Sequence, residues 1–130
     1  MAIQIVLGKT PKTFKKVPVK FLTPEGDEAV VAVVFKYRTR AAYAQFLNEM
    51  FATTDADKPA DGEKVDFEVL FAKGGEKAVE KMLDAIVSWD LADVELNKEN
   101  MLQLQNEYQA SIPAFGDAYR AACVEGKLGN

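Results

Sequence analysis

Residues 17–35 read VPVKFLTPEGDEAVVAVVF, and this stretch decides the fold of the N-terminal part of the chain. Over residues 17–22 apolar side chains alternate with other residues, which is typical of a strand with one buried face. The sequence PEGD at residues 24–27 supplies a tight turn, with glycine where a positive φ is needed. A longer β-branched run follows at residues 29–35. The pattern predicts an antiparallel β-hairpin over about residues 17–36.

The hairpin needs a cover, because two strands alone are only marginally stable in water. Thr39 is a good N-cap, and the apolar residues after it recur at the spacing of one helix face. They are Tyr43, Phe46, Leu47, Met50 and Phe51. Each such side chain contributes roughly 1.5–3 kcal/mol when it is fully buried. We therefore expect a helix over residues 40–51 that packs on the sheet.

A further β-like pattern lies upstream of the hairpin. Ile3, Ile5 and Leu7 occupy alternate positions before the sequence GKTP at residues 8–11 breaks the pattern. We expect a short strand at residues 3–7.

The C-terminal part of the chain has helical patterns. After a polar loop at residues 53–65, an apolar segment at residues 67–71 predicts a short helix that the glycine pair at residues 74–75 ends. The next helix opens at Glu76 and stops near Trp89, with apolar residues at helical spacing between them.

Two more helices follow in the last third of the chain. Asn97 and Ser111 are natural N-caps for them, and Gly126 ends the second. Together these patterns predict one α+β domain, in which an antiparallel hairpin or small sheet packs on helices and the C-terminal part is mostly helical. Its parts are residues 1–52 (hairpin plus helix), 53–65 (loop), 66–126 (helical part) and 127–130 (flexible tail).

Composition is that of an ordinary globular protein, with 48% apolar and 28% charged residues in a chain of 130. No apolar run approaches the roughly 20 residues that cross a bilayer, and the N-terminus lacks the basic region of a signal peptide. We expect a cytoplasmic protein without membrane contact. The single cysteine, Cys123, cannot form an internal disulfide and is expected to be a buried free thiol.

Catalysis is not expected, because the chain contains no histidine and therefore lacks Ser-His and Cys-His nucleophile pairs. The same absence excludes a Cys/His zinc site, so we expect neither a metal nor a cofactor. Three carboxylates lie close together at Asp90, Asp93 and Glu95. We interpret them as the solvated side of an irregular connector, because they flank apolar residues and form no catalytic motif.

Charge is distributed unevenly along the chain. Residues 1–40 hold eight basic and three acidic side chains, a net charge of +5, whereas residues 41–130 hold eight and seventeen, a net charge of −9. The lysines of the first part do not predict nucleic-acid binding, because Phe14 alone interleaves with them and the acidic part would repel phosphate. Lysines that protect exposed strand edges explain them better.

Aromatic and methionine residues at helical spacing usually form the core, and we interpret most of these stripes in that way. Trp89 is the main exception, because it lies at a predicted helix end beside an irregular segment, where an indole could anchor a partner. The candidate protein-interaction residues are Trp89, Leu91, Leu96, Tyr108, Phe115 and Tyr119.

Two segments of the chain carry a family likeness. The first is FKYRTR at residues 35–40, and the second is the block at residues 89–122, with its motifs WDL, LNKEN, LQLQNEY, IPA and DAYRAA. Together with the hairpin they span most of the chain, and the order of elements resembles that of the tail assembly chaperones of long-tailed bacteriophages.

The resemblance implies protein binding without catalysis or a cofactor. Proteins of this family coat the long tape measure protein during virion assembly, keep it soluble and help to recruit tail tube subunits. The chain is accordingly expected to act in the host-cell cytoplasm as a homo-oligomer and to be absent from the mature virion. Contact with the tail tube protein is expected through a longer form.

Ribosomal frameshifting near the end of the reading frame is the expected source of that longer form. Residues 128–130 (LGN) can be encoded with the slippery heptamer G GGA AAC in frame, and residues 125–127 (EGK) can be encoded as GAG-GGA-AAG. The resemblance therefore implies an open −1 frame beyond the stop codon.

Two other classes of function fit the sequence. A structural tail component, such as a tube-completion or connector protein, would share the small α+β make-up but would remain in the mature particle. A small regulatory protein-binding module could use the acidic C-terminal part to mimic nucleic acid. Absence from purified virions separates a chaperone from a structural component, and neighbouring tape measure and tube genes disfavour a regulator.

Overall fold

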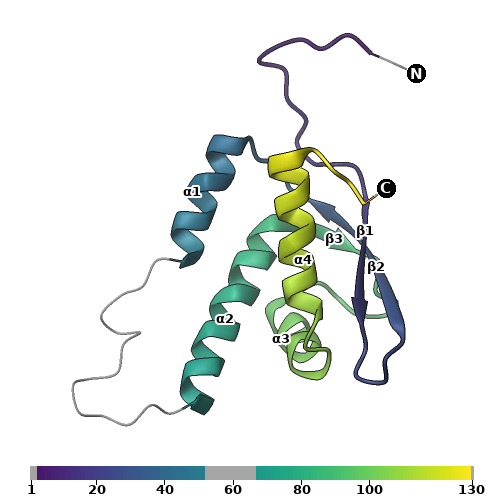
Figure 1. Ribbon diagram of the computed structural model, residues 1–130, viewed down its shortest axis with the longest axis vertical. Coiled ribbons are helices and arrows are strands. Elements are labelled where there is room, and N and C mark those ends of the chain that lie inside the picture. Colours follow the sequence, from purple (N-terminus) through teal and green to yellow (C-terminus); the bar gives the residue numbers. More distant parts are fainter. Residues whose placement is uncertain (1–2, 52–66, 130) are drawn as a thin grey trace, which may run out of the picture.

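The computed structural model describes residues 3–51 and 67–129, and Figure 1 shows their arrangement. The described chain is α+β, as predicted, with one three-stranded antiparallel sheet and four α-helices. In chain order the elements are β1 (Val17–Leu22), β2 (Glu28–Phe35), α1 (Arg40–Phe51), α2 (Phe67–Ala85), β3 (Ile86–Trp89), α3 (Lys98–Glu107) and α4 (Ser111–Arg120). A π-helical turn, Ala121–Glu125, continues α4. The predicted loop at residues 53–65 lies outside the described residues.

The predicted hairpin is confirmed. Strands β1 and β2 pair antiparallel from Val17↔Val33 to Leu22↔Glu28, and Gly26 takes a positive φ of 90° in the turn between them. One face of the hairpin is buried throughout, and its side chains are Val17, Val19, Phe21, Val31, Val33 and Phe35. The alternation along each strand therefore decides which face of the sheet meets the helices.

The prediction that a helix continues to Trp89 is wrong. The helix ends at Ala85, and the next four residues form β3, which pairs antiparallel with the end of β2. The Lys36 amide donates to the Ala85 carbonyl oxygen at 2.7 Å, beside the start of the new strand. Ile86 pairs with Phe35 and is buried. The strand forms because a partner edge lies within reach, and this tertiary context overrides the helical spacing.

The prediction that Gly74-Gly75 ends a helix is also wrong, because α2 runs through both residues. Glycine costs a helix interior about 0.8–1.0 kcal/mol relative to alanine. Here Gly75 leaves room for the Gln105 side chain of α3, since an added Cβ would lie 2.6 Å from Gln105 Oε1. Gln105 Nε2 also donates to the Gly75 carbonyl oxygen at 3.2 Å.

Residues 3–7 form no strand, contrary to the prediction, and their side chains are exposed. The chain meets the sheet later, where Thr13 pairs with Lys36 and the Phe14 amide donates to the Phe35 carbonyl oxygen at 2.9 Å. Alternating apolar residues favour a strand only where a neighbouring edge supplies backbone partners.

Two predicted N-caps are confirmed. Thr39 Oγ1 accepts a hydrogen bond from the Ala42 amide at 3.1 Å at the start of α1. Asn97 Oδ1 accepts one from the Asn100 amide at 2.8 Å at the start of α3. Each side chain satisfies an amide that has no partner within its helix.

The third predicted N-cap is wrong, because Ser111 lies inside the first turn of α4 and Ala110 occupies the cap position. Ser111 is buried, and its hydroxyl donates to the Leu104 carbonyl oxygen at 3.4 Å. The serine thus joins α4 to the end of α3. Gly126 ends the π-helical turn with a φ of 67°, as predicted for the end of the last helix.

Helix α4 lies between the sheet and the other long helices, as Figure 1 shows. Its apolar side chains Ile112, Phe115 and Tyr119 are buried, as is Ala122 in the π-helical turn. Cys123 is a buried free thiol, as expected. We expected α1 to pack on the hairpin, but the Tyr119 ring stands between them. Its centre lies 5.0 Å from that of Phe35 and 5.6 Å from those of Tyr43 and Phe46.

Candidate protein-binding groove

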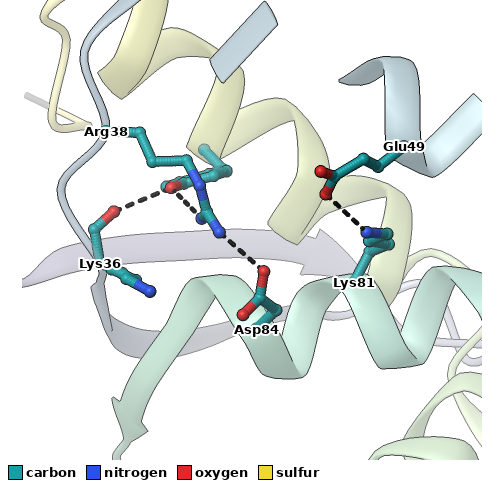
Figure 2. Close-up of polar contacts among 6 residues, drawn as sticks. Lys36, Arg38, Glu49, Lys81 and Asp84 are labelled. Carbon is teal, nitrogen blue, oxygen red and sulfur yellow. Dashed lines mark hydrogen bonds and ion pairs between the residues drawn. The ribbon is translucent and has the colours of Figure 1, made fainter. Parts of the chain in front are cut away.

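Arg38 fixes the start of α1 to the rest of the fold, and Figure 2 shows its contacts. Its Nη1 donates to the Tyr119 hydroxyl at 2.7 Å, and its Nη2 donates to the Asp84 carboxylate at 2.7 Å. The Tyr119 hydroxyl donates in turn to the Lys36 carbonyl oxygen at 2.8 Å. The guanidinium carbon lies 4.5 Å from the centre of the Phe46 ring. This Arg38 cluster joins α1, α2, α4 and the end of β2 at one point.

The electrostatics of the Arg38 cluster suit a structural role. Burial lowers the pKa of Arg38, but its hydrogen bonds and charge interactions with Tyr119 and Asp84 raise that pKa by more. Burial raises the pKa of Tyr119 above its ordinary value, although the nearby guanidinium opposes the shift. Burial likewise raises the pKa of the Cys123 thiol. The hydroxyl and the thiol therefore stay protonated at neutral pH, which does not favour proton transfer.

A second contact holds the last turn of α1 to α2. Lys81 Nζ lies 3.2 Å from Glu49 Oε2, and Figure 2 shows this pair beside the Arg38 cluster. The Glu49 side chain is 55% exposed, so the pair contributes at most about 1 kcal/mol. We infer that it sets the spacing between the two helices more than it stabilises the fold.

An open apolar groove of about 680 Å³ lies between α1, α2 and α4. Its nonpolar lining comes from all three helices and consists of Tyr43, Phe46, Leu47, Met50, Gly74, Gly75, Ala78, Met82, Ile112, Pro113, Gly116 and Tyr119. The polar residues that line it are Gln105, Gln109, Asp117 and Arg120. Its size falls within the roughly 300–1,000 Å³ of pockets that hold small molecules.

Small residues keep the groove open. A Cβ added at Gly74 or Gly116 would meet no described atom within 4 Å. On the opposite wall, Leu47 and Met50 are only half-buried, so part of their apolar surface faces the groove. Unbranched methionine adapts readily to different partners. This arrangement suits the apolar side of another polypeptide.

Five of the six predicted interaction residues lie outside this groove, and three of these belong to β3 or to the connector between β3 and α3. Trp89 ends β3, Leu91 and Leu96 lie in the connector from β3 to α3, and all three are half-buried against the core. The Trp89 indole Nε1 donates to the Val94 carbonyl oxygen at 2.9 Å. The indole therefore anchors the connector that leads from β3 to α3.

The other three predicted residues divide between the surface and the core. Tyr108 is 37% exposed at the end of α3, with its ring edge-on to Phe21. Phe115 and Tyr119 are 0% exposed and form the centre of the core, although Tyr119 also contributes to the floor of the groove. A partner could not contact Phe115 without opening the fold.

The groove residues Leu47, Met50, Ala78 and Gly116 were not among the predicted interaction residues. Leu47 and Met50 belong to the stripe that we interpreted as core, and the stripe is indeed partly buried. A signal was nevertheless present, because glycine and alanine at inward-facing helix positions leave room that larger residues would fill.

Of the three neighbouring carboxylates Asp90, Asp93 and Glu95, Asp90 has a structural role. Asp90 Oδ1 accepts from the Ala32 amide at 2.8 Å, and the Asp90 amide donates to the Ala32 carbonyl oxygen at 3.0 Å. Among the described residues, no three potential ligands gather where they could hold a metal ion. In the same part of the chain, every helix is too short or too polar to cross a bilayer.

Comparison with known proteins identifies one family. Residues 1–130 match the model of a family described as phage tail assembly chaperone. No curated protein and no solved structure matches the chain significantly. The family match covers the whole chain, and it agrees with the resemblance carried by residues 35–40 and 89–122. Membership of a chaperone family implies a non-enzymatic role. The chain therefore belongs to the phage tail assembly chaperone family.

Proposed function

We propose that this phage tail assembly chaperone binds the tape measure protein by accepting an amphipathic helix in the groove between α1, α2 and α4. The groove supports this proposal because its lining is mainly apolar and it is open to solvent. Insertion of a helix into an apolar groove is a recurrent mode of recognition. A tape measure protein not yet enclosed by its tube exposes apolar stripes, which cause aggregation unless they are covered.

The polar residues that line the groove favour a bound helix that carries both uncharged and charged polar groups beside its apolar stripe. Gln105 and Gln109 offer amide groups, while Asp117 and Arg120 carry opposite charges. These side chains can pair with polar groups that flank the apolar stripe of a bound helix. Because the charges are balanced, binding should depend mainly on apolar contact.

We further propose that the chaperone self-associates weakly through contacts between oppositely charged surfaces. The net charges of +5 in residues 1–40 and −9 in residues 41–130 support a head-to-tail contact. A partner as long as a tape measure protein offers many binding positions, so neighbouring weak contacts add up along it.

A longer frameshifted form would carry its extra segment away from the groove. Leu128 is half-buried against the core, and a Cβ on Gly129 would lie 3.2 Å from Pro18 Cδ in β1. Figure 1 shows this end of the chain beside β1, on the far side of α4 from α1. We propose that an extension leaving from here contacts the tail tube protein.

Silent recoding of the Gly129 or Gly126 codon should abolish the longer product and leave the 130-residue product unchanged. A native locus that yields only the short product, with no open −1 frame, would refute this part.

The groove is tested by filling it with Gly116→Leu. The added side chain enters open space, since a Cβ there meets no described atom within 4 Å, and leucine is a better helix former than glycine. The variant should therefore fold, yet bind a tape measure fragment at least about tenfold more weakly, which corresponds to about 1.4 kcal/mol. Affinity can be measured by calorimetry with a purified helical fragment from the same phage.

Ala44→Leu is the matched control, because Ala44 is exposed on α1 and does not line the groove. This variant adds the same side chain and should bind the fragment like the unmodified protein. Equal binding by Gly116→Leu and the unmodified protein would exclude the groove as the site. Finding the protein in purified virions would instead favour a structural tail component.

A further inference from the structure

We propose that the exposed N-terminal arm, residues 3–7, docks on the outer face of the β-sheet of a second copy and so joins subunits head to tail. The outer face is the side of the sheet turned away from α4. This inference rests on the self-association proposed above and gives it a location. It does not depend on whether the groove binds the tape measure protein.

The arm exposes more apolar surface than a solitary subunit would be expected to leave in water. Ile3 is 84% exposed, Ile5 78%, Val6 64% and Leu7 92%. These residues are consecutive except for Gln4, and exposed apolar surface of this continuity marks an interaction site. Their alternation also matches the face of a strand or extended peptide. Figure 1 shows the arm leading away from the body of the molecule.

The outer sheet face supplies a complementary surface. Its most exposed apolar residues are Leu22 at 62%, Val30 at 53% and Val87 at 54%. Ala32 and Val34 lie on the same face of β2 as Val30 and are only partly buried. The described helices pack on the opposite face, so these apolar side chains remain open to solvent, together with Lys20, which lies opposite Val30.

The geometry favours a second copy over the arm's own sheet. The root of the arm is fixed at the end of β2, where the Tyr37 amide donates to the Lys12 carbonyl oxygen at 3.1 Å. Leu22 and Val30 of the outer face lie at the hairpin end of the same sheet, whereas Val87 lies beside the end of β2. To cover Leu22 and Val30 in its own subunit, the arm would have to reverse direction and run back along the sheet. A neighbouring subunit needs no such reversal.

Charge complementarity supports the same pairing. The arm is followed by exposed basic residues, Lys9 and Lys12. The hairpin tip carries exposed acidic residues, which are Glu25, Asp27 and Glu28. When the arm covers the face near the tip, these opposite charges come together. Because arm and face are different surfaces, the contact is heterologous and can propagate into a ring or filament.

Two complementary variants test the pairing. The arm variant, Ile3→Ser, Ile5→Ser and Leu7→Ser, keeps the outer face but loses the apolar arm. The face variant, Leu22→Lys and Val30→Lys, keeps the arm but places charge on the outer face. All five side chains are exposed, so both variants should fold with unchanged circular dichroism. At low salt, sedimentation velocity should show that the unmodified protein assembles. Each variant alone should stay monomeric, with self-association weakened at least about tenfold.

Mixing the variants gives the decisive result. The arm of the face variant can dock on the intact face of the arm variant, so a 1:1 mixture should form dimers and nothing larger. A monomeric mixture, an arm variant that assembles like the unmodified protein, or an unmodified protein that is monomeric at low salt would each overturn the proposal. The control Val94→Ser, which removes a 38% exposed aliphatic residue that belongs neither to the arm nor to a strand of the sheet, should assemble normally.

Binding of the tape measure fragment separates the two proposals. Both variants should bind the fragment like the unmodified protein, because neither changes a groove residue. If the arm variant loses fragment binding but keeps self-association, the arm serves the tape measure protein and the second-copy assignment is wrong. Loss of binding by Gly116→Leu, in contrast, concerns the groove alone.

Discussion

Tyr119→Phe isolates the contribution of the Arg38 cluster, because it removes one hydroxyl and leaves the buried ring in place. The hydroxyl accepts from Arg38 Nη1 at 2.7 Å and donates to the Lys36 carbonyl oxygen at 2.8 Å. A hydrogen bond to a charged group contributes about 1.5–3 kcal/mol, against roughly 1 kcal/mol for a neutral one. The Arg38 side chain is only 13% exposed, so water replaces the lost acceptor poorly. We expect the free energy of unfolding to fall by about 2–3 kcal/mol.

Asp84→Asn is the matched control at the other end of the same guanidinium. The Asp84 side chain is 51% exposed, so its ion pair with Arg38 is screened by solvent and should contribute less than about 1 kcal/mol. Urea denaturation measures both values, provided that the slope with denaturant stays the same. A loss for Tyr119→Phe that is no larger than the loss for Asp84→Asn would refute the reasoning from burial.

Two further predictions concern helix α2 and alkaline pH. Gly74→Ala should stabilise the protein by about 0.5–1 kcal/mol in urea denaturation through helix propensity. Gly75→Ala should stabilise it less, because its Cβ would displace the Gln105 side-chain amide, whose Oε1 would lie 2.6 Å away and whose Nε2 donates to the Gly75 carbonyl oxygen. Equal gains would contradict this contact with Gln105. Thermal stability should fall as pH rises above about 9. Burial raises the pKa of three acidic groups in the folded protein above the ordinary values of 9.0 for a thiol and 10.0 for a phenol. Between the ordinary and the raised pKa the unfolded chain ionises while the folded protein stays protonated, so alkaline pH favours unfolding. The groups are Tyr43, Tyr119 and Cys123. Cys123→Ser should move the onset of the decline toward pH 10, and a melting temperature that rises with pH would contradict this sign.

The parts of the fold that depend on local sequence could be predicted. The hairpin of β1 and β2 follows from alternation and from a turn that contains Gly26, and the N-caps Thr39 and Asn97 act on amides three residues away. Strand β3 could not be predicted in the same way. Its four residues continue a helical pattern, and they form a strand because Ile86 and its neighbours pair with the end of β2, about fifty residues earlier in the chain.

The groove was harder to predict because no single segment contains it. Leu47 and Met50 come from α1, Ala78 from α2 and Gly116 from α4. Each belongs to an amphipathic pattern that equally predicts a closed core. What leaves the groove open is the spacing of the helices, which the Arg38 cluster and the pair of Glu49 and Lys81 help to fix. Such spacing depends on contacts between distant segments.

The placement of the two proposed interfaces predicts that they respond differently to salt. Helix α4 separates the groove from the sheet, so one subunit could hold a helix of the tape measure protein and still contact its neighbours. The contact between subunits brings Lys9 and Lys12 near the acidic hairpin tip, and it should weaken as the screening length falls from about 30 Å at 0.01 M salt to about 8 Å at 0.15 M. The groove is mainly apolar, so its affinity for a single tape measure helix should change little over the same range. Sedimentation and calorimetry at both salt concentrations measure the two contacts separately, and a parallel loss of both would show that charge, and not apolar contact, holds the helix.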